Sequence, residues 1–334
     1  SLYGRDDVGA GKPRVFGFAA ADHRFDRSVE QLLGETLAQA DKRFYRANFV
    51  HIGRAKLQKS YLCATVRISS WRLRCGAIKR TTMKFLALIP ARYASTRFPG
   101  KPLADLGGKP MIRHVYEKAR AFFDTCYVAT DDERIERAVA GFGGRAIMTS
   151  TDHRSGTDRC REALDKAEAL CGERFDIVVN IQGDEPFVSE EQLSLISGCF
   201  DEPSTQIATL VKAFAPHEDI FNSNSPKVVL SADGHALYFS RSAIPFLRGV
   251  EPSQWQSSHT YYKHIGLYAY RSDVLRKITA LPQGILERCE SLEQLRWLEN
   301  GYRIRTAVTM TESLAIDTPQ DLQAAVDYVL GRTK

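Results

Sequence analysis

The sequence has few of the features that mark membrane, secreted or thiolate-metal proteins. No stretch approaches the roughly 18 to 20 consecutive apolar residues that a membrane-spanning helix needs. The first residues lack the order of a secretory signal, in which a charged, an apolar and a small-residue segment follow one another. Seven cysteines are scattered without a CxxC pair, which favours reduced thiols over disulfides or a cysteine metal site. We therefore expect a cytoplasmic protein with no membrane partner.

Uniform basicity is also lacking, although the formal net charge is +6. Residues 1–82 hold 16 Lys/Arg and 7 Asp/Glu, whereas residues 83–334 hold 30 and 33. The excess of positive charge therefore belongs to the first quarter of the chain. The remainder lacks the overall charge of a nucleic-acid-binding protein, so we expect no nucleic-acid partner.

The first 82 residues contain no methionine and no clear order of elements; the first methionine is Met83. One interpretation is a basic arm that binds nucleic acid or an anionic surface. A second is an organelle transit sequence, which the seven acidic residues weaken. The interpretation that we favour is an extension of unclear role, poorly ordered or non-native, that activity does not require.

From residue 83 onward, short apolar runs alternate with helical patterns, which is typical of βα units. Strands are predicted at residues 85–91, 126–130 and 176–182, and helices at 109–122, 131–143 and 189–200. The alternation then breaks at Asp233-Gly234, a hairpin signal between two apolar runs. Further strands are predicted at 266–270 and 303–310, and further helices at 291–301 and 317–330. We expect one α/β domain, 83–334: a Rossmann-like, mostly parallel or mixed sheet flanked by helices, with a hairpin insertion at about 226–270.

The loop "PARYASTRFPGKP" (90–102) carries Arg92, Arg97 and Lys101 directly after the first predicted strand. Ligands of parallel α/β sheets bind beyond the carboxyl ends of the strands, and helix N-termini attract anions. The loop therefore predicts a site for several phosphate charges. It is neither GxxxxGK[ST] nor GxGxxG, which argues against ATPase and dinucleotide-binding interpretations. The alternative is a solvated basic loop.

The stretch "DIVVNIQGDEPFV" places Asp184 and Glu185 at the end of a buried strand. Acidic groups that face a cationic phosphate loop suggest Mg²⁺, which takes one or two carboxylates plus phosphate oxygens. A second acid, Asp317, lies where a strand-like run gives way to a helix. The alternatives are a turn residue for Asp184 and a helix-capping acid for Asp317.

Seven ordered segments together resemble one family. They are "IPARYASTRFPGKPLADLGGKPMI", "TDHRSGTDR", "VVNIQGDEP", "ALYFSRSAIP", "HIGLYAY", "LEQLR" and "IDTPQDL". They are similar to the nucleotide-diphospho-sugar transferases and, within them, to the 3-deoxy-manno-octulosonate (Kdo) cytidylyltransferases. The resemblance covers about residues 84–332 and leaves 1–82 unmatched.

The resemblance implies a role for each candidate residue. It implies Mg²⁺ held jointly by Asp184 and Asp317, and catalysis by Arg92, Lys101 and Asp184. The implied CTP-binding residues are Ala91, Arg92, Ser95, Thr96, Lys101, Ser155, Gly156 and Gln182. The implied sugar-binding residues are Arg159, Arg241, His264, Tyr268, Glu290 and Glu293. Arg241 suits the Kdo carboxylate because a guanidinium binds a carboxylate through two donors. A structural alternative stays open for several of them: surface charge for Arg159, packing for His264, pairing with Arg296 for Glu293.

The implied reaction is the transfer of CMP from CTP to Kdo by a homodimeric cytoplasmic enzyme that supplies lipopolysaccharide synthesis. Exposed apolar residues within 235–262 are the candidate dimer surface. Alternatives are a nucleotidyltransferase for 8-amino-Kdo, sialate or a sugar phosphate, and a non-catalytic nucleotide-binding module. The phosphate loop and the acid pair are both present, which argues against the last of these.

Overall fold

The computed structural model describes residues 83–94, 98–311, 316 and 318–331. It separates residues 1–80 from residues 81–334, and the description below concerns the second unit alone. Predictions for residues 1–82 and for Ser95, Thr96, Arg97 and Asp317 lie outside the described residues. Among the helices of the described part, none is both long and apolar enough to cross a membrane.

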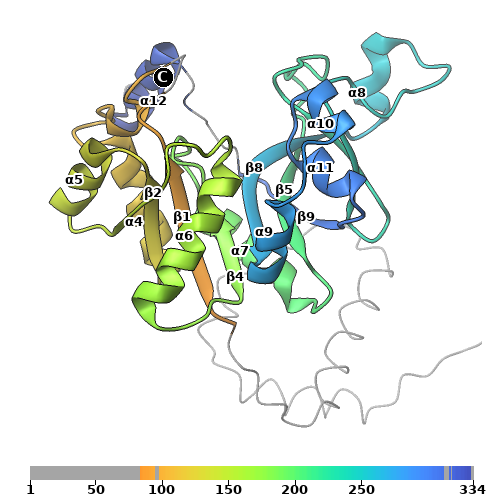
Figure 1. Ribbon diagram of the computed structural model, residues 1–334. Helices are drawn as coiled ribbons and strands as arrows, with labels where there is room; N and C mark the ends of the chain where they lie inside the picture. Colours follow the sequence, from red (N-terminus) through yellow and green to blue (C-terminus); the bar gives the residue numbers. More distant parts are fainter. Residues whose placement is uncertain (1–82, 95–97, 312–315, 317, 332–334) are drawn as a thin grey trace, which may run out of the picture. The chain divides into compact units, whose positions relative to one another are not determined.

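One mixed sheet organises the described residues (Figure 1). Its strands lie in the order β3-β2-β1-β4-β8-β5-β9, and β6 and β7 branch from β8. The strands are β1 Phe85–Ala91, β2 Cys126–Thr130, β3 Ala146–Met148, β4 Ile177–Asn180, β5 Ile207–Ala213, β6 Lys227–Leu230, β7 Ala236–Ser240, β8 Tyr262–Arg271 and β9 Ile304–Val308. Strands β3, β2, β1 and β4 are parallel, whereas β8 is antiparallel to both of its main-sheet neighbours, β4 and β5. The predicted Rossmann-like α/β class is confirmed.

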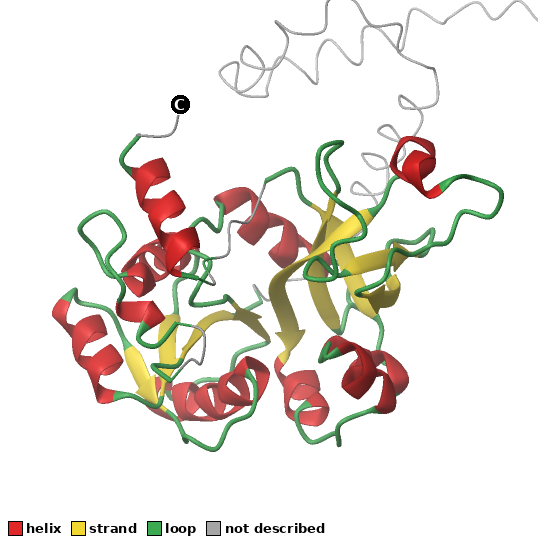
Figure 2. Cartoon of the chain, turned by 90° about the horizontal axis from the view of Figure 1, so that it is seen from above, coloured by secondary structure: helices red, strands yellow, loops and turns green. Residues whose placement is uncertain are grey.

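Helices cover both faces of this sheet; α6 and α9 lie in front of it in Figure 1 and α7 lies behind it, and Figure 2 shows the arrangement from above. The longer helices are α4 Met111–Phe122, α5 Glu133–Gly141, α6 Gly156–Cys171, α7 Glu190–Gly198 and α12 Pro319–Val329. The shorter ones are α8 Trp255–Ser258, α9 Ser272–Ile278, α10 Ile285–Glu290 and α11 Gln294–Glu299, with 3-10 turns at Lys101–Leu103, Cys199–Asp201 and Pro252–Gln254.

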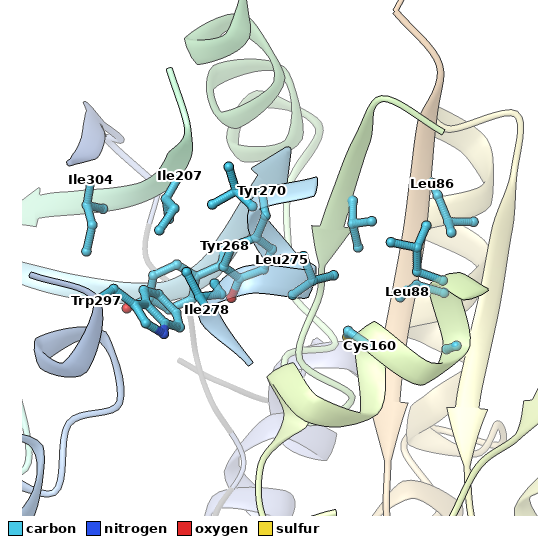
Figure 3. Packing of buried hydrophobic residues seen from close by; sticks show 14 of the residues in the cluster. Leu86, Leu88, Cys160, Ile207, Tyr268, Tyr270, Leu275, Ile278, Trp297 and Ile304 are labelled. Atoms are coloured by element: carbon cyan, nitrogen blue, oxygen red, sulfur yellow. The ribbon is translucent and has the colours of Figure 1, made fainter. Parts of the chain in front are cut away.

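Strand alternation divides the core between the two faces. Leu86 and Leu88 of β1 join one apolar cluster with Cys160 of α6, while Ala87 and Ile89 join a second cluster. This is the expected outcome for a strand covered on both sides, because successive side chains point to opposite faces. In the first cluster, Trp297 packs edge-on against Tyr268 and Tyr270 at centroid distances of 5.3 and 5.5 Å (Figure 3). All these side chains are fully or almost fully buried.

Local signals set the helix ends that border the site. Thr318 caps α12, with its hydroxyl accepting from the amide of Asp321 at 3.2 Å, and Pro319 occupies the first helical position. Ser155 caps α6 in the same way, accepting from the amide of Asp158 at 3.1 Å. Both caps fix where a helix begins beside the ends of the parallel strands.

The sequence-based strands at 85–91 and 126–130 agree with β1 and β2, and the predicted hairpin is confirmed by β6 and β7, which pair antiparallel. The strand predicted at 266–270 is longer, because β8 begins at Tyr262. The helix predicted at 291–301 is shorter and contains only α11. Strands β3 and β5 were not predicted.

Candidate active site

The phosphate loop and the acidic loop meet because β1 and β4 are parallel neighbours, with Leu88 opposite Asn180. Their carboxyl ends therefore open at the same edge of the sheet. The approach is close: a Cβ built on Gly183 would lie 2.9 Å from the carbonyl oxygen of Pro90. Only glycine lets the loop that carries Asp184 pass so near the end of β1.

Lys101 and Asp184 form the central contact of this edge. The Lys101 Nζ donates to Asp184 Oδ2 at 2.6 Å, and the side chains are 13% and 32% exposed. Lys101 is the first residue of a 3-10 turn that follows Gly100. Gly100 has a φ of 73°, in the left-handed region that favours glycine, and its amide donates a hydrogen bond to the Tyr93 carbonyl at 2.9 Å. The structure thus brings together the predicted phosphate-binding lysine and one of the two predicted metal ligands. Arg92, at the end of β1, is exposed at the same edge.

Replacement of Gly183 by alanine is expected to displace the Asp184 loop from β1. The new methyl group has no room beside the Pro90 carbonyl, so the backbone must shift, at a cost of about 1–3 kcal/mol of stability. We expect a lower melting temperature together with lower turnover. The control is Gly198→Ala at the end of α7, where nothing lies within 4 Å of the new Cβ and stability should be unchanged or slightly higher. Equal effects of the two substitutions would contradict the packing argument.

Asp184 is the predicted metal ligand that the structure describes at this edge. Asp184 offers a partly exposed carboxylate, and its main-chain carbonyl accepts from the amide of Ile316 at 3.1 Å. The second predicted ligand, Asp317, has described residues on both sides. Ile316 is hydrogen-bonded to Asp184, and Thr318 caps α12. Asp317 itself lies outside the described residues. Carboxylate oxygens are the ligands that Mg²⁺ prefers, so Asp184 fits the predicted metal.

The N-terminus of α6 also lies at this edge. A Cβ built on Gly156 would lie 3.3 Å from Cγ of Pro90, so this turn contacts the end of β1. Ala91 is buried beside it, and the Gln182 side chain donates to the Gly266 carbonyl at 3.4 Å. The structure therefore brings Ala91, Ser155, Gly156 and Gln182, four of the predicted nucleotide residues, to the region of Lys101 and Asp184.

Arg159 differs from its expected position. Its side chain is 1% exposed, and Nη2 donates to Asp131 Oδ2 at 2.8 Å while Nη1 donates to the Thr149 hydroxyl. Asp131 follows β2 and Thr149 follows β3, so Arg159 links α6 to the ends of two strands. A substrate contact and a surface charge were the two expectations for this residue. The buried ion pair argues against both, because its donors are directed into the protein.

His264 and Tyr268 are four positions apart, a spacing that predicts the same face of a strand, and in β8 their ring centroids lie 5.2 Å apart. The strand does not run regularly between them: Thr209 pairs with Tyr268 whereas Leu210 pairs with Ile265. The Thr209 hydroxyl lies 2.9 Å from the Leu267 carbonyl and 3.1 Å from His264 Nε2. The hydroxyl of the buried Thr209 thus hydrogen-bonds the main chain of β8 at this bulge, and the bulge brings the two rings together on one side of the strand. The spacing predicted the meeting but not the bulge.

Protonation of His264 is expected to destabilise the fold in acid. Burial lowers the pKa of His264 from 6.5 to about 4. Between these values the unfolded chain binds a proton that the folded chain does not, so the free energy of unfolding falls as pH drops from about 6.5 to about 4. The loss is on the order of 3 kcal/mol.

Urea unfolding of the wild type and of His264→Gln between pH 7 and pH 4 measures this effect. The wild-type free energy of unfolding should fall more steeply with decreasing pH than that of the variant. The exposed His217→Gln serves as control for the general loss of a histidine. Parallel profiles of the wild type and His264→Gln would contradict the assignment.

Arg241 and Glu290 are joined to each other. The Arg241 Nε donates to the Glu290 carbonyl at 2.6 Å, and the Arg241 amide donates to Glu290 Oε2 at 2.9 Å. The other oxygen of Glu290 accepts from the Ser240 hydroxyl at 2.7 Å. Both oxygens of Glu290 thus have partners within the protein, which differs from the expected role of Glu290 as a direct ligand of sugar hydroxyls.

Glu293 connects the sugar side to the nucleotide side. Its Oε2 accepts from the Thr157 hydroxyl at 2.7 Å, and Thr157 belongs to the first turn of α6. Its Oε1 accepts from Arg296 at 3.2 Å, the pairing that was the structural alternative. Burial raises the pKa of the Glu293 carboxyl above its ordinary value. Thr157 was not among the predicted residues, although it lies within "TDHRSGTDR".

Within the part of the chain that the structure describes, some buried polar atoms near these residues have no hydrogen bond of normal length. They include the Tyr268 hydroxyl and the Gln294 Nε2, in side chains that are 7% and 5% exposed. A buried polar atom without a hydrogen bond costs free energy, so these two positions are costly for the fold.

Comparison with known proteins places the chain in a family. The sequence profile described as cytidylyltransferase matches residues 86–305. A 3-deoxy-manno-octulosonate cytidylyltransferase of Bacteroides thetaiotaomicron is 60% identical over 254 residues, which cover 75% of this chain and 100% of that protein. The chain belongs to the cytidylyltransferase family.

More distant members agree with this assignment. The enzyme of the same name from Thermodesulfovibrio yellowstonii is 48% identical over 73% of this cytidylyltransferase and 97% of its own length. A solved structure of CMP:2-keto-3-deoxy-manno-octonic acid synthetase complexed with CTP superposes with a TM-score of 0.68 at 43% identity. It covers 75% of this chain and 100% of that one. The range that the profile matches, residues 86–305, spans the positions of Lys101, Asp184, Arg241 and Glu293.

Proposed function

We propose that this cytidylyltransferase transfers the cytidylyl group of CTP to Kdo, releasing CMP-Kdo and pyrophosphate. The observation that carries the proposal is the Lys101–Asp184 contact of 2.6 Å at the carboxyl edge of the parallel strands. The relatives named for this reaction, at up to 60% identity, and the relative solved with CTP support the choice of substrates.

The transfer needs alignment and neutralisation of charge more than a protein nucleophile. The anomeric hydroxyl of the sugar attacks the α-phosphorus of CTP, and pyrophosphate leaves from the opposite side. Lys101 and Arg92 stabilise the phosphate charge, and the first turn of α6 with Gln182 holds the cytidine. Arg241 binds the sugar carboxylate, while His264, Tyr268 and Glu293 contact its hydroxyl groups. Mg²⁺ bound by Asp184 and Asp317 would neutralise the phosphates and lower the pKa of the attacking hydroxyl.

A substrate panel tests this function. Four nucleoside triphosphates are combined with Kdo, 8-amino-Kdo, sialate and hexose phosphates, and pyrophosphate release is measured with and without Mg²⁺. We expect release with CTP and Kdo in the presence of Mg²⁺. Faster pyrophosphate release with 8-amino-Kdo or another sugar would show that this sugar, and not Kdo, is the preferred substrate. No release with any sugar would favour a non-catalytic nucleotide-binding module.

The chain is also proposed to act as a homodimer in the cytoplasm, supplying lipopolysaccharide synthesis. Exposed apolar side chains support a subunit contact: Phe221, Leu237 and Phe246 are 50%, 59% and 73% exposed. The Phe221 and Phe246 rings pack on Trp255 at centroid distances of 5.7 and 5.0 Å. Light scattering after size exclusion should give twice the chain mass for the wild type and a smaller mass for Phe246→Glu.

Deletion of residues 2–82 is expected to leave turnover unchanged. All the described candidate residues lie after residue 83, and the family profile begins at residue 86. The measurement is kcat and KM for CTP and Kdo in the shortened and full chains. A large loss of activity on deletion would show that the extension contributes to the site.

A further inference from the structure

A fully buried lysine lies beneath Arg241. Lys227, the first residue of β6, is 0% exposed, and burial lowers its pKa. Its ammonium group donates to the Arg241 carbonyl at 2.5 Å and to the Asn222 carbonyl at 2.8 Å. Burying an ammonium group is costly, so the position is tolerated only because both bonds are made. Lys227 therefore ties the residue after β7 to the segment before β6.

Glu290 also contacts the main chain at Arg241, at its amide and not at its carbonyl. Its carboxylate accepts from the Arg241 amide at 2.9 Å and from the Ser240 hydroxyl at 2.7 Å. The main chain of Arg241 is thus fixed at its amide by an anion and at its carbonyl by a cation. Burial is the main cause of the lowered pKa of Lys227, and the nearby carboxylates of Asp219 and Glu290 act in the opposite direction.

The guanidinium of Arg241 is held as firmly as its main chain. It donates to the carbonyls of Glu290, Ser291 and Ser223, at 2.6, 3.4 and 2.9 Å. A guanidinium has five N–H donors, and these bonds use one on Nε and one on each terminal nitrogen. One N–H on each terminal nitrogen is left, which is the number that a carboxylate with two oxygens accepts.

We propose that Lys227 and Glu290 are positioning residues that orient Arg241 for the carboxylate of the acid sugar, and that neither touches the substrate. The proposal rests on the proposed function, because it takes Arg241 as the group that binds this carboxylate. It assigns Lys227 a role that the sequence did not suggest, and it moves Glu290 from the sugar ligands to the support of one.

The first test separates the two substrates. Lys227→Met removes the donor and keeps the length of the side chain, so KM for Kdo should rise about tenfold while KM for CTP stays within about twofold. The matched control is Lys263→Met. Lys263 is buried opposite Lys227 in the β6–β8 ladder, but its ion pair is with Glu218. An equal rise in KM for Kdo in the control would overturn the proposal, because general loosening would explain it.

The second test uses Glu290→Gln, which keeps the size of the side chain but offers one oxygen instead of two. This variant tests the proposal independently if Lys227→Met fails to fold. KM for Kdo should rise in the same direction, and the preference for Kdo over its C1-carboxamide should fall in both variants. Unchanged KM and preference in the folded variants would overturn the proposal.

Arg241→Met distinguishes the two levels of the argument. A loss of preference for the acid over the amide in this variant supports Arg241 as the carboxylate-binding group. If Arg241→Met shows this loss and the Lys227 and Glu290 variants do not, the positioning role is wrong and the proposed function stands. If Arg241→Met keeps the preference, the proposed role of Arg241 is wrong and the positioning proposal fails with it.

Discussion

Asp184→Asn should lower turnover by several orders of magnitude, on the order of 3–5 kcal/mol in transition-state free energy, without unfolding the protein. Asparagine has nearly the same size but no charge, so it neither balances Lys101 nor supplies a carboxylate for Mg²⁺. The side chain is 32% exposed, so the fold does not depend on it. The measurement is pyrophosphate release across a range of Mg²⁺ concentrations, with circular dichroism to confirm folding.

The matched control is Asp273→Asn. Asp273 also pairs with a lysine, Lys277, at 2.8 Å, but on an exposed surface of α9, which follows β8 beside the start of β4 and not at the carboxyl edge that carries Asp184. The same chemical change there should leave kcat unchanged. Near-wild-type turnover of Asp184→Asn at saturating Mg²⁺ would show that Asp184 does not act at the reacting phosphate.

Lys101→Met is expected to lower kcat/KM for CTP by about a hundredfold or more, because preorganised positive charge at a phosphate site contributes several kcal/mol. The pair with Asp184 is partly exposed, so its loss should change stability by only about 1 kcal/mol or less. Lys101→Arg keeps the charge and should recover part of the rate, although a guanidinium does not reproduce the geometry of an ammonium. Kinetics with varied CTP at saturating Kdo give the answer.

The double variant Asp184→Asn/Lys101→Met tests whether the two groups act as one unit. Groups that act together are strongly non-additive, so the double loss should be much smaller than the product of the single losses. The surface pair of Asp273 and Lys277 provides the comparison, with no effect on rate in any combination. Fully multiplicative losses at Asp184 and Lys101 would mean that the two act independently.

The parts of the fold that the sequence predicted are those fixed by neighbouring residues. The apolar run of β1 and the Asp233-Gly234 turn each depend on a few adjacent positions. Strand β5 depends on partners that come later in the chain, because it pairs with β8 and β9. Its apolar run "IATLV" was the available signal.

The site shows the same division. Asp184 and Lys101 were predicted because each follows a recognisable strand, and the parallel pairing of β1 and β4 brings them together. The partners of Arg159 and Glu290 were not predicted, because Asp131 is 28 positions from the first and Ser240 is 50 positions from the second. A charged residue in a motif does not reveal whether its partner is a substrate or another part of the chain.

Strand β8 has one more consequence for how the enzyme works. It pairs with β4 through Tyr268 and Asn180, and with β6 through Lys263 and Lys227, so one ladder joins the parallel strands to the hairpin. The two pairings of β8 lie on either side of its irregular stretch opposite Thr209 and Leu210, so a bend in the sheet at that stretch would break neither of them. Crystals grown empty and with both substrates should therefore superpose closely on the parallel strands alone and on the hairpin alone, and any change in the angle between these two parts should arise at the irregular stretch.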